Sequence, residues 1–152
     1  MTLASPGEDG IDVYCAALVL PITAPPIADG AVAVRRGRIL HVGERDWVLG
    51  AVEGYGLPVR QRRWKGVLMP GLVNAHTHLQ YTGMASVGQG SYNGFGDWAK
   101  AFNAAYAIPR DWRADAAAGA RLALTSGTTA AADVVTDQEA ASALADARLH
   151  GI

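Results

Sequence analysis

The stretch "GVLMPGLVNAHTHLQ", residues 66–80, decides how this 152-residue chain folds. It is a nearly continuous apolar run, broken only by a Pro-Gly pair, and it ends in two histidines one residue apart, His76 and His78. An apolar run of this kind over residues 67–75 is typical of a parallel strand that is buried on both faces. In a strand, residues i and i+2 point the same way, so both imidazoles are predicted to project from one face.

The residues before this run have the pattern of short strands. The segment "GAVAVRRGRILHVGERD", residues 30–46, holds two alternating apolar runs joined at Arg36-Gly37, which predicts a β-hairpin. Strict alternation would place Ile39 and His41 on one face of the second strand, and His41 is then more readily structural or exposed than a ligand. The basic run "VRQRRWK", residues 59–65, favours a solvated edge strand protected by charge over a phosphate-binding patch.

From residue 66 onward the pattern changes to strand, loop, helix, strand, helix. A Gly-rich loop is predicted over 79–96, an Ala-rich helix over 111–124, a strand within "TSGTTAAADVV" (residues 125–135), and a second Ala-rich helix over 138–149. This order predicts an α/β fold with parallel strands. The expected domains are residues 1–66, built of short strands, and residues 67–152, built of two βα units.

Composition excludes several classes of partner. The formal net charge is −1, from 13 basic and 14 acidic residues, which gives no general attraction to nucleic acid or to an anionic membrane. The apolar runs are far shorter than a membrane-spanning helix, and the first residues lack the pattern of a secretory signal. The single cysteine, Cys15, has no partner for an internal disulfide, so a reducing, cytoplasmic location is expected.

The two histidines are the candidate metal ligands. The carboxyl ends of strands in parallel α/β folds are where ligands bind, and two imidazoles suit zinc, or iron, nickel and cobalt less selectively. The alternative is that both are histidines satisfied within a core or a loop, as in most chance occurrences of two histidines at this spacing. Their position at the end of a buried strand, opening onto a long Gly-rich loop, favours the metal site.

The segment "LMPGLVNAHTHLQ", preceded by "GAVAVRRGRILHVG", resembles the amino-terminal part of the amidohydrolase superfamily of metal-dependent hydrolases. The stretch "NAHTHLQYTGMA…FGDWAKAF" is most similar to the chlorohydrolase and aminohydrolase branch, which includes guanine, S-adenosylhomocysteine and aminofutalosine deaminases. The resemblance implies a small β-sandwich domain beside a (β/α)8 barrel and one divalent metal, Zn²⁺ or alternatively Fe²⁺. It also implies hydrolytic removal of an amino or other leaving group from a small heterocyclic substrate.

Carried over onto this sequence, the resemblance makes His76 and His78 the first two metal ligands. Gln80 is either a residue that faces the substrate or a surface residue of the loop. Trp98 is expected to reach the pocket from the start of a helix capped by Asp97. The aromatic residues spaced along that helix, Trp98, Phe102 and Tyr106, are read mainly as packing.

Two further acidic or basic positions were weighed for the same site. Asp133 lies at the end of the second strand, where a turn or capping role is the more common one. His150 is expected to end a helix, capped by Gly151, and is therefore a poor metal ligand. A general acid and a general base for catalysis are not identifiable in this chain.

A complete (β/α)8 barrel needs roughly 250 residues, whereas residues 67–152 hold two βα units and the start of a third. We therefore expect the sequence to be the amino-terminal part of a longer enzyme that hydrolyses C–N bonds. The alternative is a non-catalytic truncated remnant or interaction module, which would self-associate through exposed barrel edges.

Overall fold

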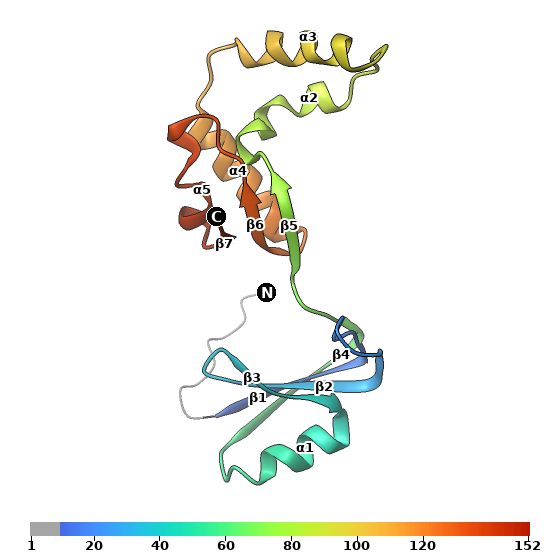
Figure 1. Ribbon diagram of the computed structural model, residues 1–152. Helices are drawn as coiled ribbons and strands as arrows, with labels where there is room; N and C mark the ends of the chain where they lie inside the picture. The colour runs from blue at the N-terminus through green and yellow to red at the C-terminus, as the bar shows by residue number, and fades with distance from the viewer. Residues whose placement is uncertain (1–9) are drawn as a thin grey trace. The chain divides into compact units, whose positions relative to one another are not determined.

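The computed structural model describes residues 10–152, and the chain divides into two compact units between Pro70 and Gly71 (Figure 1). The division lies beyond residue 66, because strand β4 (Val59–Leu68) runs through that position. Its pairing with the first strand continues to Leu68. Pro70 has no N–H to donate to a strand neighbour, so the Pro-Gly pair is a natural end for the unit.

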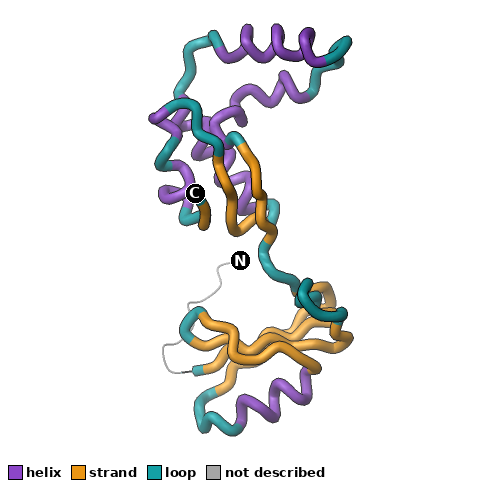
Figure 2. The backbone as a smooth tube through the Cα atoms, viewed as in Figure 1, coloured by secondary structure: helices purple, strands orange, loops and turns teal. Residues whose placement is uncertain are grey.

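The first unit is one four-stranded sheet with a helix on one face (Figure 2). Strands β2 and β3 are antiparallel to their neighbours, whereas β1 and β4 are parallel. The sheet order is β3-β2-β1-β4, so the basic run of residues 59–65 lies on an edge strand, as predicted. The elements not yet placed are β1 (Ile11–Val19), β2 (Ile27–Arg35), β3 (Arg38–Glu44) and α1 (Arg45–Glu53).

The predicted hairpin is confirmed, but its second strand contains a bulge. Both turn residues, Arg36 and Gly37, have positive φ (49° and 73°), as tight hairpin turns require. The register then shifts between two neighbouring pairs, since Ala33 faces His41 whereas Val34 faces Ile39. The extra residue moves His41 to the opposite face from Ile39. The prediction that these two residues share a face was wrong for this reason.

Helix α1 was not anticipated, because the residues before β4 were read as strands only. Its buried side chains, Val48 and Val52, are one helical turn apart and complete the core of the first unit. They pack on the buried residues of the central strands, which are Ile11, Val13, Cys15, Ala31 and Ala33. His41 lies on the same side, where its ring donates to or accepts from the Tyr55 hydroxyl (3.1 Å).

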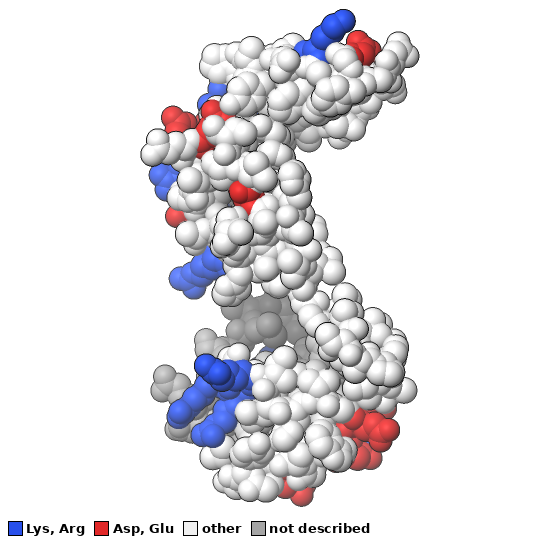
Figure 3. Space-filling model, viewed as in Figure 1, with Lys and Arg blue, Asp and Glu red and all other residues white. Residues whose placement is uncertain are grey.

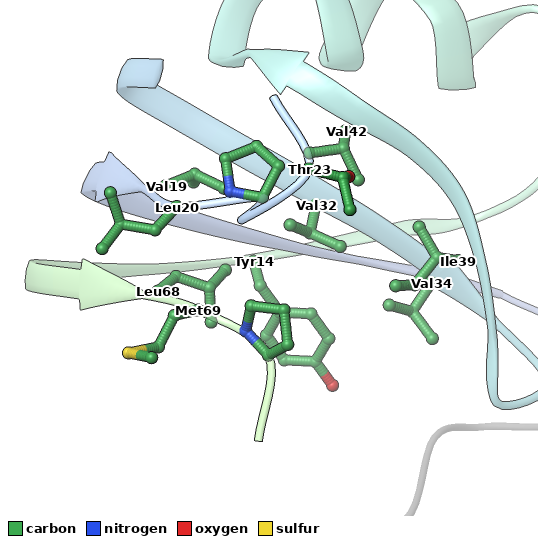
Figure 4. Close-up of a pocket in the computed structure, with 12 residues that line it drawn as sticks. Tyr14, Val19, Leu20, Thr23, Val32, Val34, Ile39, Val42, Leu68 and Met69 are labelled. Carbon is green, nitrogen blue, oxygen red and sulfur yellow. The ribbon is translucent and has the colours of Figure 1, made fainter. Parts of the chain in front are cut away.

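The opposite face of this sheet carries an apolar pocket of about 460 Å³ (Figure 4). Its walls include Tyr14, Val32, Val34, Ile39 and Leu68, which come from all four strands. Within residues 10–70 no second sheet packs on this face. The second layer of the predicted sandwich therefore stays a prediction.

The second unit is built on three parallel strands in the order β5-β6-β7, which confirms the parallel α/β prediction. Helices connect consecutive strands, as parallel pairing demands. The strands are β5 (Leu72–Thr77), β6 (Thr128–Asp133) and β7 (His150–Gly151). The connecting helices are η1 (Leu79–Met84), α2 (Ala85–Gly88), α3 (Phe95–Tyr106), α4 (Trp112–Thr125), η2 (Gln138–Ala140) and α5 (Ala143–Ala147).

Several predicted boundaries in this unit were wrong. The strand expected over 67–75 is divided between β4 and β5, and the residues of β5 are exposed or half-buried because β5 is an edge of the sheet. The loop expected over 79–96 is partly helical, as η1 and α2. Helix α3 begins after Gly94 (φ 98°) and not after Asp97, whose carboxylate instead accepts a hydrogen bond from the Asn93 N–H (3.3 Å).

The last predicted helix is also shorter than expected. It ends at Ala147, because Arg148 adopts a left-handed conformation (φ 56°) and the Leu149 N–H returns to the Leu144 carbonyl (2.9 Å). This is the hydrogen-bond pattern of a helix C-terminus. His150 therefore lies in strand β7, not at the end of a helix, and the third strand begins earlier than predicted.

Helix α4 holds the second unit together by packing on η1. Its small residues, Ala116, Gly119 and Ala120, are buried against Leu79. A Cβ at Gly119 would collide with Thr82 and the Leu79 carbonyl, so glycine permits this close approach.

On the face shown in Figure 3, charged side chains form small separate groups on a mostly uncharged surface, as the near-neutral charge predicts. Across the described part of the chain, every helix is too short or too polar to span a lipid bilayer.

Candidate metal centre

The two predicted ligands lie together at the carboxyl end of β5. His76 is in the strand and His78 follows it directly. Their ring centroids are 5.2 Å apart, with the planes at 75°. Alternation along an extended backbone brings the two rings to one side, as the sequence predicted.

His78 is fixed by a hydrogen bond to the end of the neighbouring strand. Its Nδ1 lies 2.8 Å from the carbonyl oxygen of Val134, which follows β6. A carbonyl oxygen only accepts, so Nδ1 must carry the proton. In the neutral ring this leaves the lone pair on Nε2, the atom that a metal would use.

The pair of rings fits one metal ion. Two imidazoles that bind one tetrahedral zinc through nitrogens about 2.0 Å away place their ring centres roughly 5 Å apart. The distance found here, 5.2 Å, agrees with that spacing. Within residues 10–152 no group of three histidine, cysteine, aspartate or glutamate side chains could hold a metal. The two histidines therefore fit as part of a ligand set.

Asp133 has the capping role that was the more common expectation. Its Oδ1 accepts a hydrogen bond from the Leu79 N–H (2.9 Å), at the start of η1. Beside it, the Val134 N–H donates to the Thr77 carbonyl (2.8 Å). These two bonds tie the end of β5 to the end of β6, so the backbone that carries His78 is held from both strands.

Gln80 fastens the same two strand ends through its buried amide. Its side chain is 1% exposed, and its Nε2 lies 2.5 Å from Thr136 Oγ1 and 2.6 Å from Asp137 Oδ2. Its Oε1 accepts a hydrogen bond from the Thr136 N–H (3.0 Å). Both ends of the amide are thus bonded within the protein. Contact between Gln80 and a substrate stays a prediction, and the structure gives this residue a fastening role.

Tyr106 joins helix α3 to this network. Its hydroxyl donates to Asp137 Oδ2 (2.8 Å). This hydrogen bond to a carboxylate is the main cause that raises the pKa of the Tyr106 phenol above its ordinary value. The end of α3 is therefore held to the loop that follows β6.

Trp98 lies on the aromatic stripe of α3, two helical turns from Tyr106. Its ring stacks on Phe102 (5.3 Å between centroids, 29° between planes), and Phe102 continues the stack to Tyr106. No residue of α3 is fully buried. The stripe packs as predicted yet stays partly accessible, and the substrate-binding role of Trp98 remains a prediction.

Three contributors to the site were missed in the sequence. Tyr81 stacks on His78, while Thr136 and Asp137 receive the Gln80 amide. Tyr81 follows the second histidine by three residues, which is one helical turn once η1 is recognised. Thr136-Asp137 is a polar pair directly after the apolar end of the second strand, where ligand-binding loops of parallel sheets are found.

The buried Gln80 amide yields a stability prediction. Gln80→Leu should lower the free energy of unfolding by about 1–3 kcal/mol, because it leaves the Thr136 N–H and the Asp137 carboxylate without a buried partner. Amide hydrogen exchange at Thr136 should accelerate with it. The exposed Gln89→Leu is the matched control and should change neither quantity; equal effects from both variants would contradict the fastening role.

Comparison with known families gives one clear match. The model of the amidohydrolase family matches residues 67–151, which are most of the second unit and include both histidines.

Curated relatives match shorter stretches at higher identity. A 5-methylthioadenosine/S-adenosylhomocysteine deaminase from Nitratidesulfovibrio vulgaris is 46% identical over 56 residues, which are 37% of this chain and 12% of that protein. An imidazolonepropionase from Shewanella sediminis is 42% identical over 76 residues, which are 48% of this chain and 18% of that protein. The matches thus span less than a fifth of these relatives' lengths.

Solved structures share the fold over nearly the whole chain. The Helicobacter pylori aminofutalosine deaminase, in complex with methylthio-coformycin, has a TM-score of 0.73 at 21% identity, over 92% of this chain and 34% of that one. A Xanthomonas campestris adenosine deaminase with bound zinc has a TM-score of 0.66 at 23% identity, over 97% of this chain and 34% of that one. At such identities the likeness concerns the fold.

Proposed function

The chain belongs to the amidohydrolase family, and from that premise we propose that it is the amino-terminal part of an enzyme that hydrolyses C–N bonds other than peptide bonds. Its fold is the first part of a (β/α)8 barrel preceded by a small β domain, and the barrel is incomplete in this chain, which covers about a third of the matching structures. The activity belongs to the longer protein that we propose.

The observation that carries this proposal is the prepared state of His78. Its Nδ1 is occupied by the Val134 carbonyl, so Nε2 faces outward as a donor beside the ring of His76. A histidine that merely satisfied itself in a loop would not need a second imidazole at the spacing of a shared metal. We propose that His76 and His78 hold one divalent ion, Zn²⁺ or alternatively Fe²⁺.

A bound ion of this kind lowers the pKa of its water and polarises the group under attack. This chain's own residues would supply the frame for that chemistry. Asp133 and Gln80 lock the ends of β5 and β6 together, and the Val134 carbonyl sets the tautomer of His78. The remaining ligands, the general acid and the general base would come from outside the described residues.

The proposed substrate is an aminated purine-like or related heterocycle, from which hydrolysis would release ammonia. Support comes from the deaminase names of the relatives and from the partly accessible aromatic stripe of α3, with Trp98 as the proposed contact. A flat heterocycle can stack on such rings.

The alternative, a non-catalytic remnant or interaction module, is favoured by one observation. Strand β5 presents exposed apolar side chains, with Leu72 at 49% and Val73 at 73% exposure. A surface of this kind marks a place where another chain or another part of the same chain binds.

An assay of the longer protein tests the proposed chemistry. With the gene extended in frame beyond codon 152, the purified enzyme should release ammonia from an aminated purine nucleoside, lose that activity on chelation and regain it with zinc or iron. His76→Ala in the same protein serves as the inactive control. Opening of a cyclic amide without any ammonia release would remove the deaminase proposal and keep the wider hydrolase proposal.

A further inference from the structure

Tyr81 makes the closest ring contact to the proposed metal site. Its ring lies nearly parallel to the imidazole of His78, with 14° between the planes and 4.8 Å between the centroids. It lies one turn further along the chain, in η1, so the stack is built into the local backbone. Tyr81 therefore covers one face of the ring whose Nδ1 the Val134 carbonyl already holds.

Tyr81 is itself held on several sides. Its hydroxyl lies 3.2 Å from Thr136 Oγ1, in the loop after β6. The edges of its ring meet three aromatic residues at 5.1–6.5 Å between centroids, namely Phe102, Tyr106 and Trp112. A ring fixed in this way acts as a rigid support, because rotation about its side-chain bonds would break the contacts with α3, α4 and the β6 loop together.

The other histidine of the pair is supported quite differently. His76 is exposed, and within residues 10–152 its side chain contacts the ring of His78 but has no hydrogen bond. The pair is thus asymmetric, with a fixed His78 beside an adaptable His76. Residues that orient a ligand in this way often change metal affinity by about 10- to 100-fold when they are removed.

We propose that Tyr81 is a positioning residue that holds the His78 ring, by stacking, in the orientation and tautomer that present Nε2 to a metal. This inference rests on the proposed metal site, but it makes a separate claim about the metal-free chain. Without the stack, the His78 ring is free to rotate away from Val134, and the tautomer with the proton on Nε2 becomes populated. That tautomer offers its lone pair on the wrong nitrogen.

The experiment uses the 152-residue chain and two readouts. The first is the dissociation constant for Zn²⁺, measured by competition with a chromophoric chelator. The second is the tautomer of His78 in the metal-free chain, read from the ¹⁵N chemical shifts of its ring. Tyr81→Leu should weaken zinc binding about tenfold and shift His78 from a single tautomer to a mixture. Tyr81→Phe keeps the ring and should stay close to the unsubstituted chain in both readouts.

Controls separate positioning from general damage to the fold. Tyr55→Leu removes another tyrosine that contacts a histidine, His41, in the first unit, and it should leave the zinc constant unchanged. Circular dichroism and thermal melting identify any variant that fails to fold, and the Tyr81→Phe comparison then decides the claim.

The outcomes are distinct for the two claims. A folded Tyr81→Leu chain with unchanged zinc affinity and an unchanged His78 tautomer would overturn the positioning role. A loss in Tyr81→Phe as large as in Tyr81→Leu would overturn its assignment to stacking. Absence of zinc binding by the unsubstituted chain would count against the proposed function, while the tautomer readout would still decide the role of Tyr81.

Discussion

His76→Ala and His78→Ala should each reduce zinc binding by the chain by more than about tenfold, because each removes one of two donors. The reason lies in the geometry of the pair, whose ring centroids are 5.2 Å apart, as sharing one ion requires. His78→Ala should have the larger effect, since it removes the ring that Val134 and Tyr81 hold in place. Metal analysis after gel filtration, together with chelator competition, measures both losses.

His41→Ala is the matched control for this prediction. His41 belongs to the first unit, where its ring contacts Trp47 and bonds to Tyr55, so it should leave zinc binding intact. Unchanged zinc affinity in His76→Ala would contradict the assignment of the pair, because a two-donor site does not keep its affinity after losing one donor.

The isolated chain should self-associate, and this is the second large effect that we expect. Strand β5 is an edge of its sheet, and Val73 on it is 73% exposed. Covering such apolar surface contributes about 25 cal/mol per Å², and an open strand edge offers unpaired N–H and C=O groups to a second chain. Sedimentation velocity should show oligomers that grow with protein concentration.

A charged substitution on the strand tests where the association occurs. Val73→Lys should shift the chain toward the monomer, because a lysine on an edge strand opposes edge-to-edge pairing. Leu122→Lys changes a similarly exposed apolar residue (59%) on helix α4 and should have a smaller effect. A monomer with cooperative unfolding in the unsubstituted chain would contradict this prediction and favour an independently folded module.

Local patterns predicted the parts of the fold that depend on neighbouring residues. The hairpin at Arg36-Gly37, the edge strand after residue 59 and the helix begun by Asp111 follow from turn chemistry, charge and capping. The juxtaposition of His76 and His78 also follows locally, from alternation along one strand. Each of these features is decided within a few residues of the chain.

Features that depend on distant contacts were missed or misplaced. The bulge that turns His41 to the other face is set by pairing with β2, and no pattern within residues 38–44 reveals it. Helix α1 is stabilised by packing Val48 and Val52 on the sheet, which outweighs a strand-like reading of its sequence.

The site was incomplete for the same reason. Gln80 and Tyr81 acquire their roles from Thr136 and Asp137, more than fifty residues later. Their partners became visible only when β5 and β6 were paired in the fold.

X-ray absorption spectroscopy of the zinc-loaded chain tests most directly whether His76 and His78 form a metal site. We predict outer-shell scattering from two imidazoles around each zinc, with lighter oxygen donors completing the coordination. One imidazole should be lost in His76→Ala and one in His78→Ala, while His41→Ala should keep both. A zinc spectrum without imidazole scattering, or one that is identical in all three variants, would contradict the assignment.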